Sequence, residues 1–277
     1  SMVYRTAGLI EDVLETVDRT ADDVGRQSGK AIEEYAIECS INKVYGSEML
    51  GYIVDEAVQL YGGYGYIEDY PVEQMYRDSR ILRIFEGTNE INRLITMQFL
   101  TRKAMKGEIP LLEAMGKVKA ELPGIKPVVP AVNGRPLQYQ CQLLERAKKL
   151  FLFVTEAAVT KYGQAIAEEQ EVLGRLSDIA IEVLAMESGL ARAVKSIDRS
   201  GLEASEMKIN MMKVYVNDAV SRVAEYAREV LVATASDDAL QGQLAAVNNL
   251  MQQQRVNTVA LRRAIADRAI AAEKYIC

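Results

Sequence analysis

The most regular feature of the sequence is a helical spacing of apolar residues in its second half. Apolar side chains recur every three or four residues there, which places them on one face of a helix. Four such stripes lie along residues 143–154, 172–197, 211–230 and 240–260, and the last is less regular after Met251. Breaks between stripes are predicted at Ser200-Gly201 and at Ser236-Asp237-Asp238. We therefore expect residues 137–277 to form four long helices in an antiparallel bundle.

The first half of the chain is predicted to be helical as well. Apolar residues mark one helix over residues 9–17 and a second, long helix from about Gly29 to Gln59. Residues 72–82 have the pattern of a short helix, and Thr88 is a suitable N-cap for a further helix that continues through Leu100. No stretch alternates between apolar and polar residues with a period of two, so the sequence predicts an all-α fold.

A proline-rich segment divides the chain. Five of the six prolines lie within residues 110–136, and the part that follows has none. Proline lacks a backbone N–H and interrupts helices, so this segment is interpreted as a linker that could begin with a short helix. The expected domains are residues 1–109 and 137–277. Because the first helix starts with the chain and has no N-cap, we expect the sequence to be part of a longer one.

The amino-acid composition excludes several classes of catalytic and metal-binding site. Histidine is absent, which excludes Ser-His-Asp and Cys-His catalysis, histidine-ligated zinc and Glu-x-x-His di-iron sites. The net charge of −6 argues against nucleic-acid binding, and no metal site is predicted. Cys39, Cys141 and Cys277 form no C-x-x-C pair, which is typical of a reduced intracellular compartment. No apolar run approaches the ~18 residues of a membrane-spanning helix.

Two segments could carry chemistry. Gly62, Gly63 and Gly65 follow the second helix, where glycine permits positive φ and close approach of a ligand, or simply caps the helix. Glu86 lies between Phe85 and Gly87, just before Thr88. Glu86 could act as a base, or it could be one of the acidic residues that are favoured near a helix start.

Taken together, the two segments resemble the C-terminal signature of the flavin-dependent acyl-CoA dehydrogenases. Residues 59–93 contain, in order, Gln, Gly-Gly-x-Gly, Tyr-Pro, Arg-Asp, Glu-Gly-Thr and Ile-x-Arg. The resemblance covers residues 1–109, as the second half of the family's C-terminal helical domain. The motif Arg-Ile-Phe-Glu-Gly-Thr-Asn at residues 83–89 resembles the very-long-chain branch of the family, and so does the added helical bundle of residues 137–277.

The resemblance implies a role for each matching residue. Glu86 would be the catalytic base that takes a proton from the α-carbon of an acyl-CoA thioester while the β-carbon gives hydride to FAD, and the N–H of Glu86 would bind the thioester oxygen. The acyl site would be lined by Phe85 and Gly87. The residues expected to contact FAD are Gln59, Leu60, Tyr61, Gly62 and Gly63, which would approach the cofactor of a neighbouring subunit, and Thr88, Asn89 and Glu90 at the helix start.

The resemblance also implies partners and a location. We expect fatty acyl-CoA as substrate, electron transfer flavoprotein as electron acceptor, and a homodimer or larger homo-oligomer. The expected location is the cytoplasm of a bacterium, or the mitochondrial matrix or inner-membrane face of a eukaryote. The family's N-terminal helical domain and middle β-domain have no counterpart in this sequence, so we expect the fragment alone to be inactive.

Three alternatives stay open at this stage. The chain could belong to an acyl-CoA oxidase, which shares the base and the flavin but passes electrons to oxygen. It could instead be a helical interaction module that keeps the signature without activity. The basic residues near its end could contact an anionic membrane or form an ordinary solvated helix face; they are Arg255, Arg262, Arg263, Arg268 and Lys274.

Overall fold

The computed structural model describes residues 1–131 and 134–274, with the exception of the side chain of Asp237. Every regular element within these ranges is a helix, which confirms the all-α prediction. The chain forms two compact units, one of residues Val3–Lys106 and one of residues Gly107–Cys277 together with Ser1–Met2.

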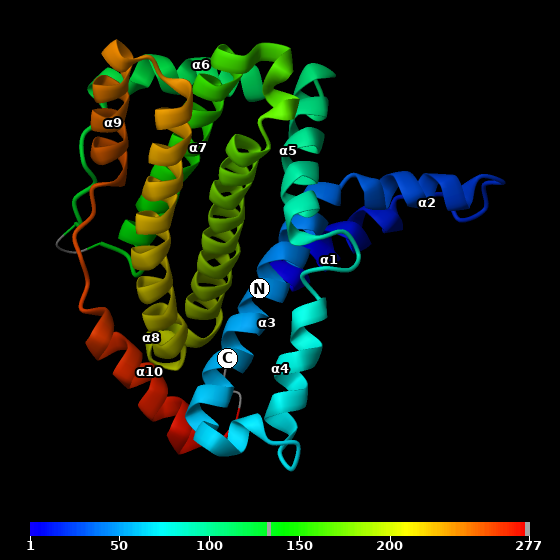
Figure 1. The fold of residues 1–277 in the computed structure, drawn as a ribbon, viewed down its shortest axis with the longest axis vertical. Coiled ribbons are helices and arrows are strands. Elements are labelled where there is room, and N and C mark those ends of the chain that lie inside the picture. Colours follow the sequence, from blue (N-terminus) through cyan, green and yellow to red (C-terminus); the bar gives the residue numbers. More distant parts are fainter. Residues whose placement is uncertain (132–133, 275–277) are drawn as a thin grey trace. The chain divides into compact units, whose positions relative to one another are not determined.

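The unit of residues Val3–Lys106 is organised around one long helix. Its elements are α1 (Met2–Glu15), α2 (Val24–Glu33), α3 (Ala36–Tyr61), the short 3₁₀ helix η1 (Gly62–Tyr66), α4 (Pro71–Ile81) and α5 (Asn89–Met105). Helices α4 and α5 both pack against α3 (Figure 1). The loop between α4 and α5, which contains Glu86, is therefore held beside α3.

Two expectations for this unit are confirmed and one is wrong. Helix α4 matches the predicted short helix, and the Thr88 hydroxyl caps α5 by accepting a hydrogen bond from the N–H of Ile91 at 3.2 Å. The predicted long helix, however, is interrupted between α2 and α3 at Glu34. The carbonyl oxygen of Glu34 accepts a hydrogen bond from Lys103 Nζ of α5 at 2.8 Å, a tertiary contact that the helical spacing does not reveal.

The second unit contains a bundle of long antiparallel helices. Its elements are α6 (Leu111–Glu121), the 3₁₀ helix η2 (Leu122–Gly124), α7 (Gln138–Tyr162), the 3₁₀ helix η3 (Gly163–Glu168), α8 (Gln170–Thr234), α9 (Asp237–Met251) and α10 (Thr258–Ala272). Helices α7, α8 and α9 pack on one another, and α10 packs on α8. Fully buried side chains fill the core, including Leu150, Leu176, Met186, Leu231 and Leu250.

Helix α8 is bent back on itself at Gly201, where the backbone takes φ 79° and ψ 175°. A positive φ of this kind is accessible to glycine at little cost. The bend divides α8 into two arms, residues 170–200 and 202–234, which run side by side in Figure 1. The predicted break at Ser200-Gly201 is confirmed.

The fourth predicted helix does not continue as expected. Helix α9 ends at Met251, and α10 starts only at Thr258. Residues between them are held outside a helix by contacts with α7 and with the chain that follows. The N–H of Gln254 donates to Tyr139 Oη at 2.7 Å, and the side chain of Asn257 caps α10 by accepting from the N–H of Ala260 at 3.0 Å.

The proline-rich segment begins with a packed helix. Met115 and Val118 of α6 are buried against α7, and Lys119 pairs with Glu156 at 2.6 Å. Between η2 and α7, the residues that the structure describes form no regular helix. The first part of the expected linker is thus part of the second unit.

The cysteines that the structure describes form no disulfide bond. Cys39 and Cys141 are free, and burial raises the pKa of both thiols, while Cys277 lies outside the described residues. None of the described helices combines the length and the apolar character that a bilayer crossing requires.

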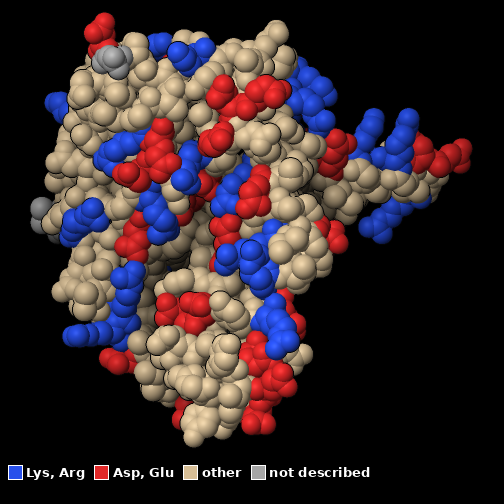
Figure 2. Space-filling model, viewed as in Figure 1, with Lys and Arg blue, Asp and Glu red and all other residues tan. Residues whose placement is uncertain are grey.

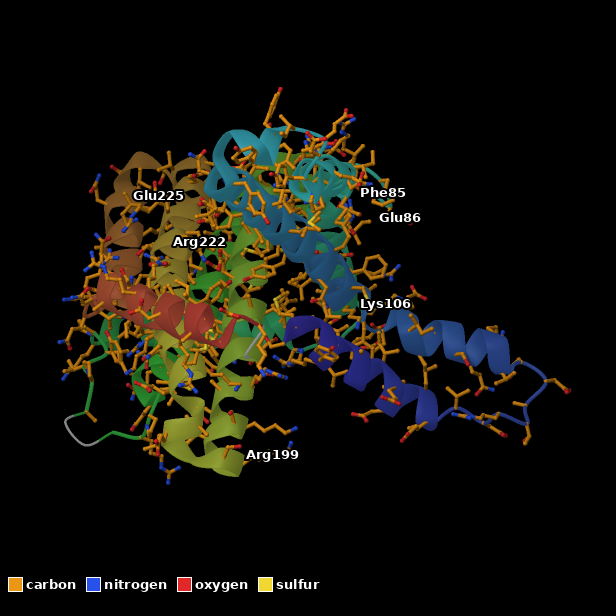
Figure 3. The ribbon with its side chains drawn as sticks, turned by 90° about the horizontal axis from the view of Figure 1, so that it is seen from below. Phe85, Glu86, Lys106, Arg199, Arg222 and Glu225 are labelled. Atoms are coloured by element: carbon orange, nitrogen blue, oxygen red, sulfur yellow. The ribbon has the colours of Figure 1, made fainter. Side chains whose placement is uncertain are left out.

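A buried carboxylate connects the two arms of α8. Glu182 is only 8% exposed and accepts hydrogen bonds from Arg222 Nε at 2.5 Å, from Arg222 Nη2 at 3.0 Å and from Tyr215 Oη at 2.8 Å. Burial acts to lower the pKa of Arg222, but its hydrogen bonds and charge interaction with Glu182 raise that pKa overall. Arg222 is labelled in Figure 3 beside Glu225, which pairs with Arg228 at the surface.

We expect Glu182→Gln to lower the free energy of unfolding by about 1–3 kcal/mol, because it removes a buried charged acceptor from two half-buried donors, Arg222 and Tyr215. Urea denaturation followed by circular dichroism measures this change. Glu225→Gln is the matched control, since an exposed ion pair contributes less than about 1 kcal/mol. Equal stability of the two variants would contradict this role for Glu182.

Candidate active site

The two halves of the signature lie at different places along α3. The loop that carries Glu86 lies beside Lys43, near the start of α3, whereas Gln59 to Gly63 end that helix. Lys43 and Gln59 are therefore about 24 Å apart along the helix axis. Within one chain, the candidate base and the glycine segment do not come together.

The candidate base lies in a strained turn. Glu86 has φ 57° and Gly87 has φ 76°, so two successive residues adopt left-handed backbone conformations. Such a conformation is unfavourable for a residue other than glycine and persists only where the surroundings impose it. The side chains of Glu86 and Phe85 are exposed on this turn, and Figure 3 labels both. The carboxylate is thus accessible to a ligand.

Two side chains hold the turn from the inside. Asn92 Nδ2 lies 2.8 Å from the carbonyl oxygen of Gly87, 3.1 Å from that of Thr88 and 3.5 Å from that of Glu86. Lys43 Nζ donates to the same Gly87 oxygen at 2.6 Å. Asn92 is only 7% exposed, so this amide group is committed to the backbone of the turn.

Asn89 anchors the turn to α3. Its side chain is only 2% exposed and forms hydrogen bonds with Lys43 Nζ at 2.7 Å, with Ser47 Oγ at 2.9 Å and with Glu48 Oε1 at 3.1 Å. Its N–H donates to the carbonyl oxygen of Arg83 at 3.0 Å. Both the side chain and the N–H of Asn89 are therefore hydrogen-bonded within the fold.

The carboxylate of Glu90 lies in the first turn of α5, which the Thr88 side chain caps. The pKa of Glu90 is lowered, chiefly because its carboxylate accepts a hydrogen bond from its own backbone N–H and further because it accepts one from Thr88. Burial lowers the pKa of Lys43, although the negative charges of Glu90, Glu48 and Glu86 act in the opposite direction. The start of α5 thus combines one partly buried cation with several carboxylates.

Some N–H groups of the turn stay available. The N–H groups of Glu86, Gly87 and Thr88 have no hydrogen-bond acceptor within the part of the chain that the structure describes. Those of Asn89 and Ile91 are occupied. A ligand oxygen could therefore bind at the turn before the helix rather than at the first helical residues.

The glycine segment forms an exposed end of α3. A Cβ atom added at Gly62 or Gly63 would meet nothing within 4 Å. Gly62 also ends α3 as its C-cap, with φ 58°, so the interpretation of these glycines as a helix cap is confirmed for Gly62. Leu60, Tyr64 and Tyr66 are 87%, 64% and 84% exposed, and acidic side chains lie along one edge of this end in Figure 2. This end could accept a flat ligand or another chain.

Sequence analysis missed the side chains that hold the turn. They are Lys43, Ser47, Glu48, Asn92 and Arg93, and Arg93 forms two hydrogen bonds with Glu48 at 2.8 and 3.0 Å. One signal was present, because Thr88, Asn92 and Thr96 repeat every four residues and place a polar stripe on the buried face of α5. The partners on α3, in contrast, are far away in the sequence.

Two family models match the chain. Both are described as the acyl-CoA dehydrogenase C-terminal domain, and they match residues 2–101 and 146–249. The first match includes all the candidate site residues. The second covers most of α7, α8 and α9.

Individual relatives agree with these models. A probable acyl-CoA dehydrogenase of Bacillus subtilis is 44% identical over 99% of this chain, which corresponds to 46% of that protein. The human very long-chain specific acyl-CoA dehydrogenase of mitochondria is 33% identical over 74% of this chain and 33% of its own length. The chain thus spans less than half the length of these relatives.

A solved structure shares the fold. The crystal structure of an acyl-CoA dehydrogenase from Bacillus anthracis, complexed with FAD, superimposes with a TM-score of 0.94 and 42% sequence identity, and covers 100% of this chain and 46% of that one. The family models, the relatives and this fold agree with the signature in residues 59–93. The chain belongs to the acyl-CoA dehydrogenase family.

Proposed function

We propose that this chain supplies the catalytic base and part of the FAD site of an enzyme that converts fatty acyl-CoA to trans-2-enoyl-CoA. The observation that carries the proposal is the exposed Glu86 carboxylate in a left-handed turn whose neighbouring N–H groups have no partner among the described residues. A carboxylate that the fold holds in one place, beside free hydrogen-bond donors, suits proton abstraction next to a carbonyl group.

In this mechanism, Glu86 removes a proton from the α-carbon of the thioester, and its carboxylate becomes a carboxylic acid. The developing negative charge on the thioester oxygen is stabilised by the backbone N–H of Glu86. Phe85 and Gly87 flank the reacting carbons and exclude water from them. FAD, when it is bound, supplies the acceptor for the hydride that leaves the β-carbon.

The residues present fit part of an FAD site. Gly62 and Gly63 present bare backbone on an exposed helix end, where a flat ring system can approach closely. Thr88 has a free N–H near the start of α5, which suits a phosphate oxygen. Gln59, Leu60 and Tyr61 lie beside the two glycines, about 24 Å from the level of Lys43 on α3. We therefore propose that this end of α3 contacts the FAD of a second subunit.

The proposed partners follow the same reasoning. The exposed Leu60, Tyr64 and Tyr66 support contact with another copy of the chain in a homodimer or larger homo-oligomer. Electron transfer flavoprotein is the electron acceptor proposed from the family. Rapid reoxidation of the reduced flavin by oxygen in stopped-flow measurements would instead indicate an acyl-CoA oxidase.

Glu86→Gln tests the base. The variant is made in a full-length protein, in which this chain is joined to the part of a relative that the chain does not cover. We expect the rate of acyl-CoA dehydrogenation to fall at least ~10²-fold, because the amide keeps the shape of the side chain but cannot accept the proton. Flavin absorbance should show an unchanged FAD content. Glu68→Gln, which changes an exposed carboxylate before α4, is the matched control. Near-normal turnover of Glu86→Gln would reject the proposal.

The 277-residue chain by itself is expected neither to retain FAD nor to oxidise acyl-CoA. Catalysis requires reacting atoms within about 3–3.5 Å in a fixed orientation, and the chain covers only 46% of the length of its FAD-bound relative. Absorbance after gel filtration with added FAD and an assay with an artificial electron acceptor measure both properties. Dehydrogenation by the chain alone would overturn this expectation.

Membrane contact through α10 is expected to be weak. Arg262 is paired with Asp218 at 2.6 Å, and Arg255 donates to Ser221 Oγ at 3.1 Å, so part of the basic charge is used within the fold. Exposed Val259 and Ile270 are the only large apolar groups on the outer side of α10 in the described chain. An amphipathic membrane helix needs a wider apolar face than this.

Co-sedimentation with vesicles that contain anionic lipid tests this contact. We expect Arg263→Glu combined with Arg268→Glu to leave the sedimented fraction unchanged. Vesicles of neutral lipid are the control for non-specific pelleting. If the unsubstituted chain sediments with anionic vesicles and the double variant does not, α10 binds lipid.

A further inference from the structure

Three successive carbonyl groups of the Glu86 turn point toward the same side chain. The oxygens of Glu86, Gly87 and Thr88 lie 3.5, 2.8 and 3.1 Å from Asn92 Nδ2, and Lys43 Nζ approaches the central oxygen at 2.6 Å. Carbonyl dipoles that converge in this way repel one another unless donors lie between them. One amide group and one ammonium group therefore hold the cluster together.

The inward direction of these carbonyl groups determines where the neighbouring N–H groups point. The C=O and the following N–H of a trans peptide point in opposite directions, and the structure has no cis peptide bonds among its described residues. Because the carbonyls of Glu86 and Gly87 point inward, the N–H groups of Gly87 and Thr88 point outward. Neither has an acceptor in the described ranges, so both are available to a ligand oxygen.

The turn is not one that the backbone adopts by itself. Glu86, with φ 57°, is in a region that side chains disfavour, and Gly87 has φ 76°. A Cβ atom on Gly87 would lie 3.0 Å from Asn92 Nδ2, so the amide is packed directly against the glycine. Without inner donors, the turn would relax and Glu86 would change its direction.

We propose that Lys43 and Asn92 are positioning residues for Glu86: they draw the carbonyls of residues 86–88 inward, and so aim the carboxylate and turn the N–H groups of Gly87 and Thr88 outward. The claim that this positioning serves catalysis rests on the proposed function. Lys43 contributes a charge-assisted hydrogen bond and also binds Asn89 at 2.7 Å, so it couples the turn to the start of α5. Asn92 contributes two donors on one rigid group.

Hydrogen exchange in the 277-residue chain tests the positioning directly and needs no cofactor. In Lys43→Met and in Asn92→Asp, we expect the backbone N–H groups at positions 89 and 92, which are hydrogen-bonded in the native turn, to exchange about tenfold faster. The amides of α4 should be unaffected. The matched controls are Lys30→Met on α2 and Gln98→Glu on the exposed side of α5. Unchanged exchange in both test variants would overturn the proposal.

Asn92 is buried, and its replacement by Asp could unfold the unit. Circular dichroism and the exchange of α4 report such unfolding. Lys43 is only half-buried, so Lys43→Met then carries the test alone. Lys43→Arg, which keeps the charge and the donors, should restore most of the protection of Asn89.

Kinetics of the FAD-loaded enzyme separate positioning from a merely structural role. We expect Lys43→Met to lower kcat about 10- to 100-fold, with KM within about threefold and FAD content unchanged, because a misaligned base slows the chemical step. Lys43→Arg should recover most of kcat. Loss of FAD, a change in KM alone or no rescue by Arg would contradict the proposal. Normal turnover of Glu86→Gln would instead reject the proposed function and leave the exchange result intact.

Discussion

The candidate site depends on the hydrogen bonds that Asn92 and Lys43 donate to the backbone of the Glu86 turn. A left-handed conformation at a residue such as Glu86 costs about 1–3 kcal/mol, and it is stable only when other interactions offset that cost. Here the donors are partly or fully buried, where unsatisfied carbonyl groups are unfavourable. The same contacts that stabilise the strained turn therefore also determine the direction of its one accessible carboxylate.

Helix α3 separates the two parts of the family signature. Its early residues Lys43 and Ser47 hold the Glu86 turn, and its last turn leads into the exposed glycine segment. A straight helix of this length is rigid, so a single chain cannot close the distance between them. A site that uses both parts must include residues from elsewhere, which agrees with the proposed contribution of Gln59 to Gly63 to a second subunit.

The second unit contributes stability rather than recognisable chemistry. Its most distinctive polar feature, the pair of Glu182 and Arg222, connects the two arms of α8. The bend at Gly201 allows one continuous stretch of chain to form two adjacent helices of the bundle. The family-model match over residues 146–249 lies within this unit.

The sequence by itself determined the helical class, the bend at Gly201, the Thr88 cap and the identity of the acidic residue in the signature, because these depend on local periodicity, on glycine and on side chains a few positions apart. It did not determine the interruption at Glu34, the end of α9 at Met251 or the inner contacts of the turn. Those depend on Lys103, Tyr139 and Lys43, which lie tens of residues away from the backbone groups that they bind. Only the tertiary structure decided them, since a hydrogen bond between distant segments leaves no periodic trace in either one.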